Sequence, residues 1–144
     1  MKKTPVAQTA GVYATRIQTF EGSVMRLSDV LTLTQARFVS ANVSPDVEVR
    51  AGFAADLMSD ALRYDLSGAL LVSGLATPQV VRTAEMADVA AILMVRDKVP
   101  PPEALDLAEE LGIPFLTTQL TMFETCGKLF AGGLPPCERC NGHK

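Results

Sequence analysis

Three residues close to the C-terminus have the types and the spacing of metal ligands. Cys137 and Cys140 form a Cys-x-x-Cys pair, and His143, the only histidine of the chain, follows three positions later. Zinc prefers thiolate and imidazole ligands, and cysteines also hold iron–sulfur clusters. Three ligands are one short of a closed zinc site, so a second copy of the chain or a protein partner would complete it. The pair could instead be a redox dithiol or part of a tail without chemistry, and these alternatives stay open.

The third cysteine, Cys126, belongs to a different pattern. It shares an apolar stripe of helical spacing with Met122, Phe123, Leu129 and Phe130. We therefore expect Cys126 to be a buried, inert thiol. A count of three cysteines is odd and too small for a disulfide framework. This count favours a reducing compartment, and we expect the cytoplasm.

A second group of candidate residues follows the predicted strands. In an open parallel sheet, ligands bind beyond the carboxyl ends of the strands, where helix N-termini point their free N–H groups. We expect a nucleotide or a phosphate-like anion at this edge. The candidate ligand-binding residues are Ser73, Gly74, Thr77, Arg96, Thr117 and Thr118. The simpler alternative is that the glycine turns the chain and the threonines cap helices, with no ligand bound.

The sequence contains no recognisable set of catalytic residues. The only histidine lies one residue from the C-terminus, which leaves no Ser/His/Asp or Cys/His arrangement inside the domain. The glycine-rich signatures of dinucleotide sites and P-loop NTPases are absent. Asp56 and Asp60 lie one helical turn apart and could hold a hard cation, although the charge of Asp56 near a helix N-terminus is a simpler explanation. We expect a protein that is not an enzyme.

The composition narrows the class of protein. A chain of 144 residues with 48% hydrophobic and 20% charged residues is typical of one globular domain. The net charge of −3 argues against nucleic acid as a partner. No apolar run approaches the ~18 residues of a membrane span, so we expect no membrane association. We expect a flexible N-terminal arm over residues 1–25, an α/β domain over 26–134, and a Cys/His-containing tail over 135–144 that leaves the domain.

Short apolar runs alternate with helical patterns from about residue 26 onwards. The predicted strands occupy residues 36–43, 47–53, 69–73, 90–95 and 113–117. The predicted helices occupy residues 27–31, 57–62, 78–87 and 121–131, and a further helix starts in the prolines at 100–102 and ends before Gly112. Apolar strands separated by helices indicate a parallel sheet that is covered on both faces. The expected fold class is α/β, with three layers, a mostly parallel sheet of four or five strands, and helices on both faces.

Several of these segments together resemble the DRTGG domain family. The resemblance covers about residues 26–134 and rests on the segments 54–60, 71–75, 77–86, 117–118 and 121–127. The five-letter string that names the family is absent. Asp46 is the candidate for its aspartate, and Val47 follows where the family has an arginine.

The resemblance implies an α/β domain similar to the N-terminal domain of HPr kinase/phosphorylase. Related domains accompany phosphotransacetylases and CBS-regulated pyrophosphatases, where they are regulatory and dimer-forming modules. Small stand-alone members are similar to proteins found with iron-only hydrogenases and electron-bifurcating enzymes. The Cys137 and Cys140 tail lies outside the matching region.

Two functional hypotheses follow. The first is a non-catalytic regulatory or interaction module, homodimeric, that binds a nucleotide or anion at the strand ends. The alternative is an accessory protein that binds zinc or an iron–sulfur cluster through Cys137, Cys140 and His143, with a hydrogenase or another redox enzyme as its partner.

Overall fold

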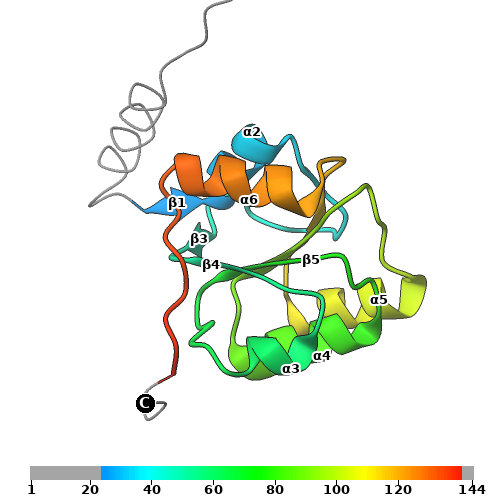
Figure 1. The fold of residues 1–144 in the computed structure, drawn as a ribbon. Coiled ribbons are helices and arrows are strands. Elements are labelled where there is room, and N and C mark those ends of the chain that lie inside the picture. The colour runs from blue at the N-terminus through cyan, green and yellow to red at the C-terminus, as the bar shows by residue number, and fades with distance from the viewer. Residues whose placement is uncertain (1–23, 141–144) are drawn as a thin grey trace, which may run out of the picture.

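The structure is a computed structural model, which describes residues 24–140 (Figure 1). Its helices are α2 (Leu27–Thr34), α3 (Met58–Ala61), α4 (Pro78–Ala87), α5 (Pro102–Leu111) and α6 (Met122–Ala131). Its strands are β1 (Met25–Arg26), β2 (Arg37–Phe38), β3 (Glu48–Val49), β4 (Gly52–Ala54), β5 (Leu70–Ser73), β6 (Ala91–Met94) and β7 (Phe115–Thr117). In this part of the chain no helix is long and apolar enough to cross a membrane.

Five of the strands form one sheet in the order β2-β7-β6-β5-β4. Strands β4 to β7 are parallel to one another, and β2 joins β7 in the antiparallel direction. Strands β1 and β3 form a small antiparallel pair of their own. The predicted sheet, mostly parallel and of four or five strands, is confirmed.

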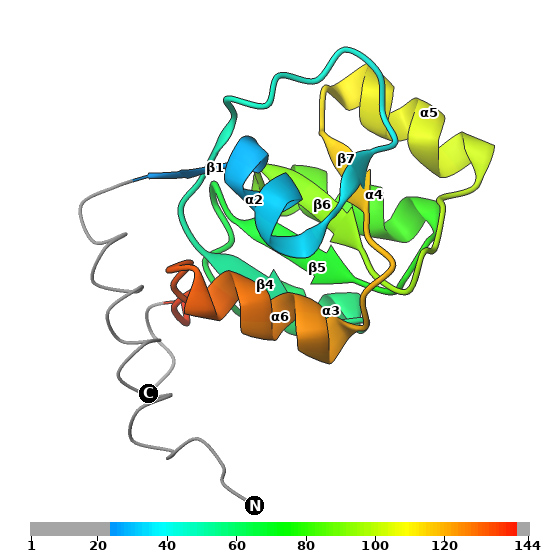
Figure 2. The same ribbon diagram turned by 90° about the horizontal axis from the view of Figure 1, so that it is seen from above.

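Helices cover both faces of this sheet (Figures 1 and 2). Successive strand side chains point to opposite faces, so the apolar runs divide between two halves of the core. Leu71, Ile92 and Phe115 pack on the side of α3, α4 and α5. Leu70 and Leu93 pack on the side of α2 and α6. The predicted three-layer architecture is confirmed.

Local sequence explains where the long helices begin and end. Proline occupies the first helical position of both α4 and α5, where its missing N–H costs nothing. Helix α5 ends at Gly112, whose φ of 73° is the left-handed conformation that glycine adopts without strain. Helix α6 begins at a capping box, in which Thr121 and Glu124 each accept a backbone hydrogen bond from the other residue.

Two predicted strands are shorter than expected. The strand predicted over residues 36–43 is limited to β2, because Val39 and Ser40 both donate to the carbonyl of Phe115 and the regular ladder ends there. The strand predicted over residues 47–53 divides into β3 and β4. Between them, the Arg50 N–H donates to the carbonyl of Gly68 (3.0 Å), which separates the two pairings.

The segment of residues 135–140, here called the edge segment, lies beside β4, the last strand of the sheet. The Gly52 N–H donates to the carbonyl of Pro135 (2.8 Å), and the Cys137 N–H donates back to Gly52 (3.1 Å). Further along, the edge segment pairs with the residues after α3 through a bridge between Tyr64 and Arg139. Up to Cys140 the chain therefore does not leave the domain, contrary to the prediction for the tail.

The predicted N-terminal arm falls largely outside the described residues. Its last residue, Met25, pairs with Val49 of β3 and is 4% exposed, so the organised chain includes at least this position. The prediction for residues 1–23 lies outside the described part of the chain.

Candidate functional site

The strand order brings the predicted site loops to one edge of the sheet. Ser73 of β5 is in register with Met94 of β6, and Met94 is in register with Thr117 of β7. Parallel strands end at the same edge, so the loops after these three strands are neighbours.

The loop after β5 is tied to the loop after β4. The Gly74 N–H donates to Oδ1 of Asp56 (2.7 Å), and the Ser73 hydroxyl lies 3.4 Å from the same oxygen. The Ser73 Oγ also accepts from the Leu75 N–H (3.0 Å). Ser73 is fully buried, and these bonds occupy its hydroxyl. Asp56 therefore positions the loop, a role that was not assigned to it from the sequence.

Arg96 lies against the backbone of Gly74. A Cβ atom on Gly74 would stand 2.8 Å from Nη2 of Arg96 and 3.3 Å from Oδ1 of Asp56. Glycine at position 74 therefore allows the guanidinium to contact the backbone, which a larger residue would prevent. Arg96 is exposed, and among the described residues the ion pairs within 4.0 Å involve other arginines, Arg26 and Arg50.

The backbone around Arg96 is unusual. Arg96 and Asp97 both have φ values of 58°, in the left-handed region that side chains other than glycine rarely adopt. Two backbone bonds hold the turn, from the Arg96 N–H to the carbonyl of Leu120 (2.8 Å) and from the Asp97 N–H to that of Thr118 (2.7 Å). The loop after β7 thus fixes the direction in which Arg96 leaves the sheet.

Thr77 is the N-cap residue of α4, as predicted, but its side chain makes no capping hydrogen bond. The first helical residue is Pro78, which has no N–H. The N-terminus of α4, with the partial positive charge of a helix start, therefore has no side-chain cap of its own. In the chain, this helix start comes directly after the loop that contains Gly74.

The two threonines of the predicted set are placed differently. Both are buried, and their hydroxyls donate to backbone carbonyls: Thr117 to Lys98 (2.6 Å) and Thr118 to Thr34 (2.7 Å). The cap of α6 is Thr121 and not Thr118, so that part of the simpler alternative is wrong. The threonines line a separate hollow of about 190 Å³, and its other lining residues are Gln35, Arg37, Asp97 and Gln119.

The order of the strands does not itself create a binding crevice. Along the sheet, β4, β5, β6 and β7 follow one another without a reversal of order. A crevice between parallel strands opens where the order reverses, and these four strands have no such switch point. Here we call Gly74, Thr77, Arg96 and Asp56 the strand-end site.

Cys126 contacts the half of the core between the sheet and α6, and it is half-buried. Desolvation by burial raises the pKa of its thiol, which disfavours the reactive thiolate. The predicted apolar stripe is only partly confirmed. Leu129 is 3% exposed, but Phe123 and Phe130 are 88% and 55% exposed and point away from the core.

Cys137 is buried, whereas Cys140 is half-buried, and all three cysteines of the chain are free. Burial is the largest cause that raises the pKa of the Cys137 thiol; Asp65 raises it further and Arg50 opposes the shift. His143, the third proposed ligand, lies outside the described residues. Within residues 24–140 no group of three or more His, Cys, Asp or Glu side chains is placed to hold a metal ion.

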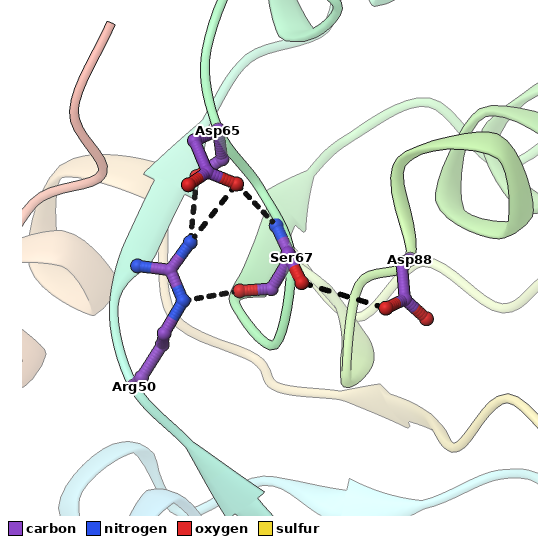
Figure 3. A network of polar contacts seen from close by, with 4 residues as sticks. All are labelled: Arg50, Asp65, Ser67 and Asp88. Atoms are coloured by element: carbon purple, nitrogen blue, oxygen red, sulfur yellow. Dashed lines mark hydrogen bonds and ion pairs between the residues drawn. The ribbon is translucent and has the colours of Figure 1, made fainter. Parts of the chain in front are cut away.

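A small polar network supports the edge segment (Figure 3). Arg50 forms an ion pair with Asp65 (3.2 Å) and donates to the backbone carbonyls of Asp65 and Ser67. Ser67 in turn donates from its N–H to Asp65 (3.2 Å) and from its hydroxyl to Asp88 (3.4 Å). The Asp65 N–H donates to the carbonyl of Glu138 (2.9 Å), so the network holds the backbone that receives the edge segment.

Sequence reasoning did not predict an apolar groove between β4, α6 and the start of the edge segment. The groove has a volume of about 150 Å³, and among its lining residues are Phe53, Cys126, Phe130, Leu134 and Pro135. The prolines at 135 and 136 indicate an extended chain after α6, because proline disfavours helix. They do not indicate that this chain lies beside β4, which is distant in sequence.

The chain is similar in fold to solved structures that include the CBS and DRTGG domains of the regulatory region of Clostridium perfringens pyrophosphatase, complexed with activator, diadenosine tetraphosphate. The TM-score is 0.62 and the sequence identity is 15%, with 89% of this chain and 61% of that chain covered. The likeness shows the fold alone. No family model matches the sequence, and no curated protein matches it either.

Proposed function

We propose that the protein is a non-catalytic regulatory module that binds a nucleotide or another phosphate-bearing anion at the strand-end site. The observation that carries this proposal is the exposed guanidinium of Arg96, which lies against Gly74 beside the start of α4. A cation and an uncapped helix N-terminus together attract a phosphate group. The pyrophosphatase region of similar fold is regulatory and binds a dinucleoside polyphosphate, which supports the choice of ligand class.

Thermal unfolding in the presence of ligands tests this proposal. We expect millimolar diadenosine tetraphosphate, ADP or pyrophosphate to raise the melting temperature by mass action. Arg96→Ala should reduce the shift strongly, because the cation of the site is lost. Arg82→Ala removes an exposed arginine from the body of α4 and is the matched control, which should leave the shift unchanged. An equal shift in wild type and Arg96→Ala would contradict the assignment of the site.

Gly74→Ala provides a second variant with the charge intact. The added Cβ would lie 2.8 Å from Nη2 of Arg96, so the flexible guanidinium must move away from the loop. We expect roughly tenfold weaker anion binding, equivalent to about 1.4 kcal/mol, with little change in the melting temperature of the free protein. Unchanged affinity would show that the position of the guanidinium over Gly74 is not needed.

We further propose that the protein acts as a cytoplasmic homodimer. Exposed apolar side chains, among them Phe123 and Phe130 on α6, are the support for self-association. Size-exclusion chromatography with light scattering is expected to return twice the single-chain mass of 15.4 kDa. A single-chain mass at micromolar concentration would refute the dimer.

The metal-binding alternative has less support. A zinc site requires deprotonated thiols that converge on one ion, and Cys137 is buried against the sheet with a raised pKa. Anaerobic preparation followed by elemental analysis and visible spectroscopy distinguishes the two functions. Stoichiometric zinc or iron that disappears in Cys137→Ser would favour the alternative.

A further inference from the structure

The edge segment holds its two cysteines at separate places. It is attached at one end to Gly52, through the N–H groups of Gly52 and Cys137, and at the other end to the residues after α3. There, the Asp65 N–H donates to Glu138 and the Cys140 N–H donates to Arg63 (3.2 Å). Figure 1 shows this part of the chain running from the end of α6 past β4 as a drawn-out segment.

An extended segment keeps these thiols apart. Three extended residues span about 10 Å, whereas the Cα atoms of a disulfide lie at most about 7 Å apart. Residues separated by an odd number of positions also point to opposite sides of an extended chain. In agreement, Cys137 packs into the core with Ala51 and Leu66, while Cys140 lines a hollow beside Tyr64 and Met86.

The backbone that receives the segment is the more firmly held partner. The carboxylate of Asp65 is paired with Arg50 and accepts a hydrogen bond from the Ser67 N–H (Figure 3). Strand β4 is hydrogen-bonded to β5 along its other edge. By contrast, after Leu134 the segment is attached through a few backbone bonds, the buried Cys137 side chain and the Arg139 guanidinium, which lies over the ring of Tyr64 (5.9 Å). A change that brings the thiols together must therefore move the edge segment.

We propose that Cys137 and Cys140 are a redox switch, in which oxidation to an intrachain disulfide releases the edge segment from β4. The oxidant is a disulfide, either a small molecule such as glutathione disulfide or a protein. The Cys140 thiolate attacks one sulfur of the oxidant and expels one thiolate. After local opening, Cys137 attacks the mixed disulfide and expels the second. Two thiols and one disulfide thus become one disulfide and two thiols.

The release has a structural consequence. The Gly52 N–H and C=O lose their partners, so the edge of β4 is free to pair with another chain. One wall of the apolar groove, at Pro135 and Pro136, leaves with the segment. The reduced protein therefore covers this edge and the oxidised protein presents it. None of these steps depends on the strand-end site.

Oxidation of the full chain with glutathione disulfide tests the switch. Peptide mapping should find a Cys137–Cys140 disulfide, and amide hydrogen exchange should accelerate at least tenfold at Gly52 and Cys137. Ile92 in the central strand β6 should keep its protection, which separates local release from global unfolding. Reduction with dithiothreitol should restore the original rates.

Two variants serve as controls. Cys126→Ser removes the cysteine that contacts the other half of the core, and it should leave the oxidation response intact. Cys140→Ser, at a half-buried position, should fold normally and show no acceleration of exchange on oxidation. The proposal is overturned if the disulfide forms without faster exchange at Gly52. It is also overturned if only mixed glutathione adducts form, or if Ile92 exchanges as fast as Gly52.

Discussion

Several residues at the carboxyl ends of the strands make structural hydrogen bonds that could not be inferred from their residue types. Thr118 was a candidate ligand, yet its hydroxyl donates to the carbonyl of Thr34, 84 residues earlier. Asp56 was explained by its position near a helix start, yet it anchors Gly74. Arg96 differs from both, because its side chain is exposed and the backbone alone defines its position.

Glu124 is a residue whose ionisation should affect stability. The backbone N–H of Thr121, followed by its hydroxyl, lowers the pKa of this carboxyl, and Lys128 adds to the effect. A pKa that is lower in the folded state stabilises the fold above the unfolded-state pKa, and this contribution is lost as the pH falls through the folded value.

We therefore expect Glu124→Gln to lower the free energy of unfolding at pH 7. The difference from wild type should shrink as the pH falls below the ordinary glutamate pKa of 4.5, because the wild-type carboxyl becomes protonated. Urea unfolding as a function of pH measures this. Glu110→Gln changes an exposed glutamate of α5 and is the control. A Glu124→Gln effect that is constant over this pH range would contradict the capping assignment.

At the scale of elements, the sequence predicted the helices and strands that are marked by nearby residues, such as a proline at a helix start or a continuous apolar run. Helices α4 and α6 begin at Pro78 and Met122, within one residue of the expected positions, and α5 begins at Pro102, the last of the three prolines expected to start it. Strands β5, β6 and β7 lie inside the predicted apolar runs. Pairings between distant segments could not be predicted, because hydrophobic periodicity carries no information about the partner. The β1–β3 pair and the edge segment on β4 are both of this kind.

Gly127, in the middle of α6, and Gly132, the residue that follows its last turn, offer a matched test of element packing. A Cβ atom on Gly127 would meet nothing within 4 Å, whereas one on Gly132 would lie 2.6 Å from Cδ1 of Leu33 and 3.2 Å from the carbonyl oxygen of Lys128. Gly127→Ala should stabilise the protein by about 1 kcal/mol, because alanine favours the helix.

Gly132→Ala should instead destabilise the protein by roughly 1–3 kcal/mol through overpacking between α2 and α6. Both values come from denaturant unfolding with an unchanged m-value. If the two substitutions had the same sign, the close approach of α2 and α6 at Gly132 would not be a determinant of stability.

At the scale of the whole molecule, the monotonic order of β4 to β7 has a direct consequence for function. Consecutive right-handed crossovers between adjacent strands place α3, α4 and α5 on the same face of the sheet. In agreement, buried residues of all three helices belong to one core cluster. Without a switch point, the proposed binding depends on features local to the loops. The strands predicted that the candidate residues lie at the carboxyl ends of the sheet. They could not predict that Arg96 is exposed while the hydroxyls of Thr117 and Thr118 are occupied by backbone carbonyls.

We propose that an anion binds between Arg96 and the start of α4, and titration of the ¹⁵N-labelled chain with pyrophosphate, followed by amide chemical shifts, is the sharpest test of this binding. We expect saturable shifts that cluster at Gly74, Leu75, Gln79 and Arg96, and that vanish in Arg96→Ala. Shifts that cluster elsewhere, or no shifts at millimolar pyrophosphate, would contradict it.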